Sequence, residues 1–319
     1  MRRFLLALAA AAVSLTLQAQ EWPARPVKIV APFAPGGTAD TLGRLIAKSL
    51  SDQLKESFVV ENRAGAGGVV GSEFVAKSPP DGYTLVISGI ASHVIAPHLP
   101  GGTPYDPLKD FTHIALLGGP PAVFAVNPSL PANNLKEFVA LAKKQPGKLT
   151  YGSPGAGTQG QLVAELFKRE AGIDLVHVPY KGAAAAVTDL MGGQINSVST
   201  TLTTASGQIK GGRARALALS SAERLPDYPD IPTFAEQGYP NIIGTVWFSL
   251  SGPAGMPADI VNRLNAEVRR ALELSEVRAR LRHDGMLPNR LDAKEFTAFV
   301  ADELRRWGPI VRASGAKNE

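Results

Sequence analysis

Twice along the chain, a short apolar run typical of a strand leads into a glycine-rich turn and then into an amphipathic helix. The first of these units covers residues 27–54 and the second covers residues 148–170. A strand, a tight turn and a helix in this order form the building block of parallel α/β sheets. Because the unit occurs in both halves of the chain, we expect two α/β lobes.

The remaining segments repeat the pattern on a smaller scale, and proline and glycine clusters separate them. Expected strands cover 27–31, 58–61, 84–88, 122–126, 148–152, 175–180, 194–199, 215–220 and 246–251. Expected helices cover 38–54, 72–77, 134–145, 158–170, 183–191, 258–274, 276–282 and 293–314.

The order of these elements predicts a chain that builds one lobe, builds a second and returns to complete the first. We place lobe 1 at residues 20–123 and 223–319, and lobe 2 at residues 124–222. Two crossovers, near 122–126 and 215–224, would form a hinge. Sheets of this kind bind ligands at the carboxyl ends of their strands, so a cleft between the lobes is the expected binding site.

Residues 1–19 have the composition of a secretory signal peptide. Arg2 and Arg3 precede an apolar run at 4–17, and small residues follow around Ala19. A membrane-spanning helix needs about 20 apolar residues, and this run is shorter. We therefore expect cleavage near Ala19 and an exported mature protein that is free in its compartment.

The composition excludes several classes of function. The sequence has no cysteine, which removes disulfides, thiolate metal sites and thiol nucleophiles. The net charge is +5, and the lysines and arginines are scattered between acidic residues and form no basic stripe, so no nucleic-acid partner is expected. We expect no metal site and a structural role for the histidines, whose spacing fits no metal-ligand pattern: His93, His98, His113, His177 and His283.

The two glycine-rich turns, at 35–38 and 155–158, are the candidate ligand-binding site. Glycine lets a backbone approach a ligand, and the first N–H groups of the following helix have no partner within the helix. These groups carry the positive end of the helix dipole, so two such helix starts could hold an anion without lysine or arginine. Alternatively, the glycines serve only the turns, with Thr38 and Thr158 as helix N-caps.

Residues 155–160 also match the dinucleotide-binding pattern GxGxxG. That pattern requires an acidic residue about 20 positions further on, at the end of the next strand. Residues 178–181 occupy that position and include no carboxylate, so no cofactor is expected. The sequence has no GxSxG, Walker A or HExxH motif, and it indicates no base for Ser88, Ser92 or Ser153. We therefore expect no catalytic residues.

Short motifs with a fixed order run through the chain after the expected signal peptide. They are Trp22-Pro23, Pro32-Phe33, Pro35-Gly36-Gly37, Glu61-Asn62-Arg63, Gly65-Ala66-Gly67-Gly68, Pro80-Asp81-Gly82-Tyr83, Tyr151-Gly152-Ser153-Pro154-Gly155, Val178-Pro179-Tyr180-Lys181-Gly182, Pro232-Thr233-Phe234-Ala235-Glu236-Gln237-Gly238 and Pro253-Ala254-Gly255. Each motif is weak alone. Together they resemble the substrate-binding proteins of tripartite tricarboxylate transporters, also called the Bug receptor family, over essentially the whole mature chain.

This resemblance implies a type II periplasmic binding protein fold, in which two α/β lobes with two hinge crossovers enclose a ligand cleft. It also implies that backbone amides of the glycine loops hold the ligand and that integral-membrane permease subunits receive it. The candidate ligand-binding residues are Phe33, Gly36, Gly37, Thr38, Ala66, Gly67 and Ser88 from the first lobe and Ser153, Gly155, Gly157, Thr158 and Asn196 from the second.

Two positions depart from the family pattern. Gln161 stands where the family usually has histidine, and it would complete a capping box with Thr158. Asn196 stands where the family usually has aspartate, which removes a negative charge from the expected cleft. An inference about the ligand that depends on this aspartate therefore does not carry over to this chain.

The sequence thus predicts a monomeric periplasmic receptor for a small carboxylate. Two alternatives are a subunit that presents its ligand to a membrane sensor kinase and an exported enzyme that acts on a small acid. Monocarboxylates, dicarboxylates, tricarboxylates, amino acids and aromatic acids all remain open as ligands.

Overall fold

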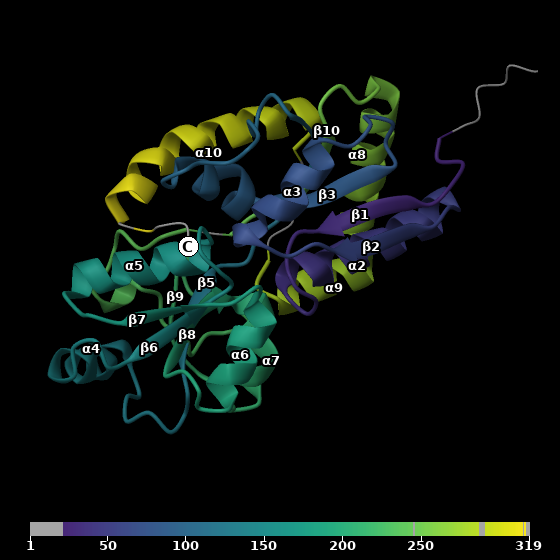
Figure 1. Ribbon diagram of the computed structural model, residues 1–319. Helices are drawn as coiled ribbons and strands as arrows, with labels where there is room; N and C mark the ends of the chain where they lie inside the picture. The colour runs from purple at the N-terminus through teal and green to yellow at the C-terminus, as the bar shows by residue number, and fades with distance from the viewer. Residues whose placement is uncertain (1–21, 245, 287–290, 315, 317–319) are drawn as a thin grey trace, which may run out of the picture.

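The computed structural model describes residues 22–244, 246–286, 291–314 and 316. Two lobes, each built on a five-stranded sheet, lie side by side (Figure 1). The predicted signal peptide lies outside the described residues. Among the helices that the structure describes, none has the length and apolar character needed to span a membrane.

The sheet of the first lobe has the strand order β2-β1-β3-β10-β4. β1, β2 and β3 run parallel, and β10 is antiparallel to both of its neighbours. Helices cover this sheet on both faces, which explains why its central strands are almost continuously apolar. The strands are β1 (Val27–Ala31), β2 (Phe58–Asn62), β3 (Thr84–Gly89), β4 (Phe111–Gly118) and β10 (Phe248–Pro253).

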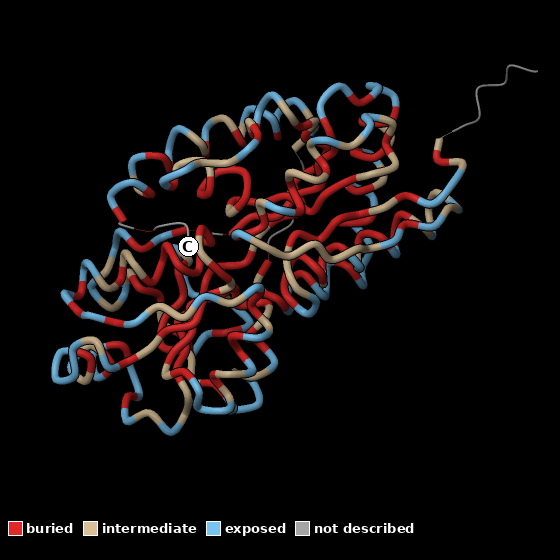
Figure 2. The backbone as a smooth tube through the Cα atoms, in the orientation of Figure 1, coloured by how far each residue is buried: buried red, intermediate tan, exposed pale blue. Residues whose placement is uncertain are grey.

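The helices around this first sheet place their apolar faces on one core, which Figure 2 shows as the buried centre of the lobe. The last helix, α10, reaches the second lobe, where Arg169 of α5 donates a hydrogen bond to the carbonyl of Ala313. The helical elements are α2 (Thr38–Leu54), η1 (Ala66–Gly68), α3 (Val69–Ala76), the π-helical turn η2 (Ala91–Ile95), η3 (Ala96–His98), α8 (Ala258–Glu273), α9 (Ser275–His283) and α10 (Ala293–Ser314).

The second sheet repeats the arrangement with the order β7-β6-β8-β5-β9. β6 is parallel to β7 and β8, and β5 is antiparallel to β8 and β9. Its strands are β5 (Ala122–Val126), β6 (Thr150–Ser153), β7 (Val176–Pro179), β8 (Ser197–Thr201) and β9 (Arg215–Leu219). Its helices are α4 (Leu135–Lys144), α5 (Gln159–Ala171), α6 (Ala183–Met191), α7 (Leu202–Lys210) and the short η4 (Ala235–Gln237).

The chain crosses between the lobes twice, and the two crossings touch. The first lies at 119–121 between β4 and β5, and the second enters β10. Val246 N–H donates to the carbonyl of Pro120 at 2.9 Å. A Cβ on Gly119 would lie 1.5 Å from the Val246 carbonyl oxygen, so this close approach requires glycine. The crossings therefore form a paired connection.

The predicted α/β fold of two lobes is confirmed, but the predicted lobe boundaries differ from the sheets and cores. Ala122 and Val123, predicted to lie in lobe 1, begin β5 of the second sheet. The segment after residue 222 stays on the second lobe, where Phe234 and Ile242 join its core. These buried apolar side chains anchor the segment to the second lobe.

The elements that the prediction lacked include β4, the turn η2 and the helix α7. The sequence of α7, LTTASGQIK, contains glycine and several residues that favour helices weakly. It forms because Leu202 and Ala205 are buried in the core of the second lobe. Tertiary packing, and not local helix propensity, therefore determines that this segment is helical.

Candidate functional site

The carboxyl ends of the parallel strands in the two sheets meet at a pocket between the lobes, here called the main pocket. Gly89 at the end of β3 and Thr201 at the end of β8 both line it. Its apolar lining includes Phe33, Ile87, Ile90, Val246, Trp247 and Phe248. Its polar side chains are Thr38, Ser92, Thr158, Gln159 and Thr201. No charged side chain among the described residues lines it.

The helix α2 begins at the main pocket without a side-chain cap. Gly37 is the N-cap residue of α2, and no side chain makes a capping hydrogen bond at this position. Thr38 and Ala39 open the helix and line the pocket. Their N–H groups have no acceptor within the helix and carry the positive end of its dipole. The alternative in which Thr38 caps this helix does not hold, because Gly37 occupies the N-cap position.

Asp40 shapes this turn from outside the pocket. Its carboxylate accepts hydrogen bonds from Gly36 N–H at 3.0 Å and from the Asn62 amide at 3.0 Å, and it pairs with Arg44 at 2.9 Å. Burial alone would raise the pKa of Asp40, but the hydrogen bonds from Gly36, Arg44 and Asn62 outweigh burial and lower it. The carboxylate is therefore ionised and balanced by Arg44, so it leaves the positive potential of the helix start in place.

The helix α5 begins at the same pocket with the predicted cap. Thr158 Oγ1 accepts from Gln161 N–H at 3.4 Å and donates to the Gly155 carbonyl at 2.7 Å. Gln161 Oε1 accepts from Gly157 N–H at 2.8 Å, one residue before the position in a standard capping box. The N–H groups of Gln159, the first residue of α5, and of the residue after it have no acceptor within the helix.

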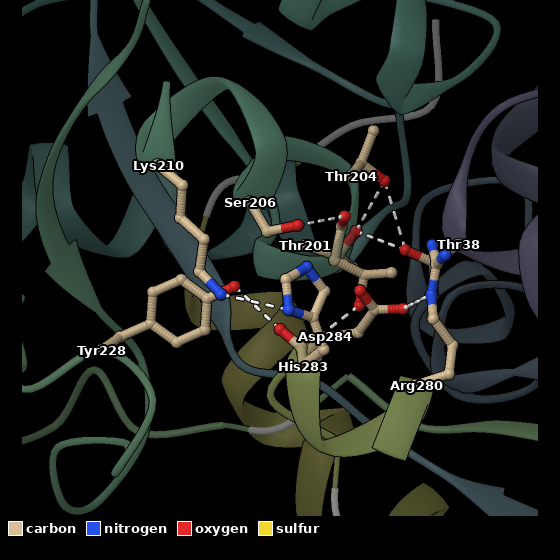
Figure 3. Close-up of polar contacts among 10 residues, drawn as sticks. Thr38, Thr201, Thr204, Ser206, Lys210, Tyr228, Arg280, His283 and Asp284 are labelled. Carbon is tan, nitrogen blue, oxygen red and sulfur yellow. Dashed lines mark hydrogen bonds and ion pairs between the residues drawn. The ribbon is translucent and has the colours of Figure 1, made fainter. Parts of the chain in front are cut away.

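The lobes touch across the cleft, so the structure is closed. Thr38 Oγ1 lies 2.7 Å from Thr201 Oγ1 and 3.2 Å from Thr204 Oγ1, and Figure 3 shows these three hydroxyl groups pointing toward one another. Ala34 N–H of the first lobe donates to the Lys181 carbonyl of the second at 3.2 Å. Closure therefore uses hydroxyl and backbone groups.

A second pocket, the glycine pocket, adjoins the main pocket and shares Phe33 and Pro154 with it. Ala66 and Gly67 line it from the first lobe. A Cβ on Gly67 would lie 2.3 Å from the carbonyl oxygen of Ala156 in the second lobe. The closed form therefore requires glycine at this contact.

The structure brings most of the predicted site residues together. Gly36 lies beside the pockets, where an added Cβ would be 3.3 Å from the Cβ of Ala184. The N–H of Gly157 donates a hydrogen bond to the side chain of Gln161. The predicted residues that line one of the two pockets are Phe33, Gly37, Thr38, Ala66, Gly67, Gly155 and Thr158.

Ser88 and Asn196 line neither pocket, contrary to the prediction. Ser88 alternates with Ile87 and Gly89, which do line the main pocket, and its hydroxyl bonds instead to Ser249 Oγ at 2.6 Å. Asn196 precedes β8, at the edge of the sheet opposite the carboxyl ends. Its Oδ1 accepts from the backbone N–H of Thr150 at 2.9 Å. Both side chains therefore tie strands together.

Ser153 is also directed away from the pockets, and a histidine that the sequence did not indicate lies next to it. Its Oγ is 2.7 Å from His177 Nε2. His177 stacks on Tyr151, and its Nδ1 lies 3.5 Å from the amide nitrogen of Gln161. Because Ser153 is fully buried, this pair stabilises the turn and does not present a nucleophile to the cleft.

Sequence reasoning missed Gln159 and Thr201, which both line the main pocket. Thr201 was missed because the predicted strand ended at 199, two residues before the end of β8. Gln159 gave a weak signal, because it directly follows Thr158 at the start of a predicted helix. No group of three or more histidine or acidic side chains in the described part of the chain could hold a metal ion.

Two α/β lobes that are joined by paired crossings and closed on a shared cleft define the class of periplasmic binding proteins. Within that class, the chain belongs to the family described as "Tripartite tricarboxylate transporter family receptor", whose profile matches residues 42–316.

Relatives and solved structures agree with this assignment. Protein BugT of Bordetella pertussis is 35% identical over 311 residues, covering 97% of this chain and 95% of BugT. An R. palustris protein solved with adipate is 34% identical with a TM-score of 0.90, covering 93% of this chain and 99% of that one. MatC from Rhodopseudomonas palustris, with bound malate, is 33% identical with a TM-score of 0.87, covering 91% of this chain and 100% of MatC. The fold class predicted from the sequence is thereby confirmed.

Proposed function

We propose that this protein binds a small carboxylate in the main pocket and delivers it to the membrane subunits of a tripartite transporter. The observation that carries the proposal is the meeting of two helix starts, α2 and α5, at a pocket without charged side chains. Such a site favours an anion through fixed dipoles. The acids bound by similar proteins, adipate and malate, support a carboxylate.

Binding and closure are coupled in this proposal. A ligand that contacts both helix starts has more contacts in the closed form than in the open form, so it shifts the population toward closure. The paired crossings near Pro120 and Val246 would act as the hinge. The closed form is then the state that the membrane subunits recognise.

The variant Gly37→Val tests the site. Gly37 has an ordinary φ of −82°, and the nearest atom to an added Cβ is the Ala34 carbonyl oxygen at 3.7 Å, so the lobe accommodates the change. The larger side chain fills space at the α2 start. We expect adipate and malate to raise the melting temperature of the wild type and not that of the variant, as measured by thermal-shift titration.

The control is Gly207→Val on the exposed face of α7, where nothing lies within 4 Å of an added Cβ. It should keep the full thermal shift. Equal shifts in the Gly37→Val variant and the wild type would contradict the assignment of the main pocket as the binding site.

The transport role, export and monomeric state are tested separately. In cells that lack this chain, uptake of the bound acid should fall, and a variant of the chain without residues 1–19 should not restore it. Normal uptake with a lost transcriptional response to the acid would favour the sensor alternative. Light scattering of the mature chain should give the mass of a monomer, and any larger mass would contradict that part of the proposal.

A further inference from the structure

Gln159 differs from the other polar side chains of the main pocket. It is 2% exposed, and neither the oxygen nor the nitrogen of its amide has a hydrogen-bond partner in the described structure. By contrast, the hydroxyl groups of Thr38, Thr158 and Ser92 are all engaged. Buried polar groups without partners are rare because they are costly, so a buried amide at a ligand pocket indicates that the ligand supplies the partner.

The position of this amide is defined by the crossing segment. Its nitrogen lies 2.8 Å from the place that a Cβ would take on Gly244, and the Trp307 ring lies 3.0 Å from the same place. Two hydrogen bonds to Ser220 fix the backbone of Gly244. The N–H of Gly244 donates to the Ser220 carbonyl at 2.9 Å, and the Ser220 hydroxyl donates to the Gly244 carbonyl at 2.6 Å. The Gln159 side chain therefore extends from the α5 start toward the crossing that bounds the pocket.

An amide selects its partner by chemistry. It offers donor hydrogens and an acceptor oxygen in one plane. An ionised carboxylate could pair only with the donor and would bring a negative charge against the acceptor, while an alkyl group would pair with neither. A carboxamide pairs with both. The described residues that line the main pocket include no lysine or arginine that could neutralise a second negative charge.

We propose that Gln159 determines specificity by binding the end of the ligand remote from its carboxylate. It selects a neutral group that both donates and accepts a hydrogen bond, of which a carboxamide is the simplest case. The preferred ligand is then a carboxylate with an apolar middle, which contacts the apolar pocket lining, and a neutral polar end, and it binds more tightly than the matched dicarboxylate. This inference rests on the proposed binding of a carboxylate in the main pocket.

Two matched series of acids test the proposal. They are butyrate, succinate and succinamate, and hexanoate, adipate and adipate monoamide, each series sharing one carboxylate and one chain length. Dissociation constants are measured by titration calorimetry. In the wild type, the half-amide should bind the tightest in the series that fits the pocket. In Gln159→Leu, its affinity should fall about tenfold or more, while the affinity for the alkyl acid stays the same or rises.

Gln159→Met keeps the side-chain length without an amide, and it should give the same pattern if the leucine variant folds poorly. Gln145→Leu, exposed at the end of α4, serves as the matched control and should leave the ranking unchanged. A wild type that prefers the dicarboxylate, or a ranking that survives loss of the Gln159 amide, would overturn this inference alone. Failure of every acid to bind the wild type would overturn both this inference and the proposed function.

Discussion

His113 lies in the first lobe with both of its ring nitrogens bonded. Its Nε2 donates to the Pro107 carbonyl at 3.0 Å, so its Nδ1 accepts from the Ser251 hydroxyl at 3.1 Å. Burial lowers the pKa of His113 to about 4, against the smaller opposing effect of the Pro107 hydrogen bond. Burial also lowers the pKa of the neighbouring His93, and the proximity of His113 lowers it further. Both rings are therefore neutral in the folded protein.

This neutrality predicts a pH dependence of stability. Between pH 6.5 and 4 the unfolded chain binds a proton at His113 that the folded chain does not, so the free energy of unfolding falls as the pH falls through this range. For His113 alone, we expect a loss of about 2 kcal/mol between pH 8 and pH 5. Urea denaturation at a series of pH values measures it.

The comparison variant is His113→Gln, which keeps a side chain that can hydrogen-bond but does not titrate. Its free energy of unfolding should be lower at pH 8 and should change less between pH 8 and pH 5 than that of the wild type. A pH dependence identical to that of the wild type would show that protonation of His113 does not govern stability in this range.

At the scale of elements, the two helix starts differ although their sequences are similar. Thr158 caps α5, whereas α2 begins at Gly37 with no side-chain cap. We expect Thr158→Ala to lower the free energy of unfolding by about 1–2 kcal/mol because it removes a helix cap. Denaturant titration measures the change.

Thr188→Ala is the control, since its hydroxyl bonds only to the Ala184 carbonyl within α6 and lies at the surface. Its effect should stay within about 0.5 kcal/mol. If both variants lowered the free energy of unfolding by the same amount, the Thr158 cap would stabilise α5 no more than an exposed hydroxyl stabilises α6.

The elements that could be predicted from the sequence are those set by local pattern. The α2 bounds match the prediction exactly because a glycine turn and a helical apolar period mark them. Side-chain direction could not be predicted in the same way. Whether Ser88 or Ile87 faces the pocket depends on which side of β3 the ligand occupies. Asn196 was a candidate only through the family resemblance, and it precedes β8 at the end of the strand away from the pocket. Such errors arise where tertiary packing decides.

At the scale of the whole molecule, closure depends on small residues where the lobes meet. Gly182 has an extended φ of 167°, which any residue adopts, but a Cβ there would lie 3.1 Å from that of Ala34 in the other lobe. We therefore expect Gly182→Val to leave each lobe intact and to weaken binding of the carboxylate about tenfold by opposing closure. Calorimetry measures the affinity, and small-angle scattering with ligand should show a larger radius of gyration.

Gly192→Ala is the matched control, because the nearest atom to its added Cβ lies 3.7 Å away in the same lobe. It should bind and close like the wild type. Normal compaction of the Gly182→Val variant with ligand would mean that the interface near Ala34 tolerates more space than the structure indicates.

The hydroxyl contact among Thr38, Thr201 and Thr204 has a consequence for the conditions under which the receptor works. These groups carry no formal charge, so dissolved ions do not screen their attraction as they screen exposed ion pairs. The balance between the separated and the joined lobes should therefore change little between dilute and saline surroundings. Contacts of this kind suit a protein whose surroundings vary in ionic strength.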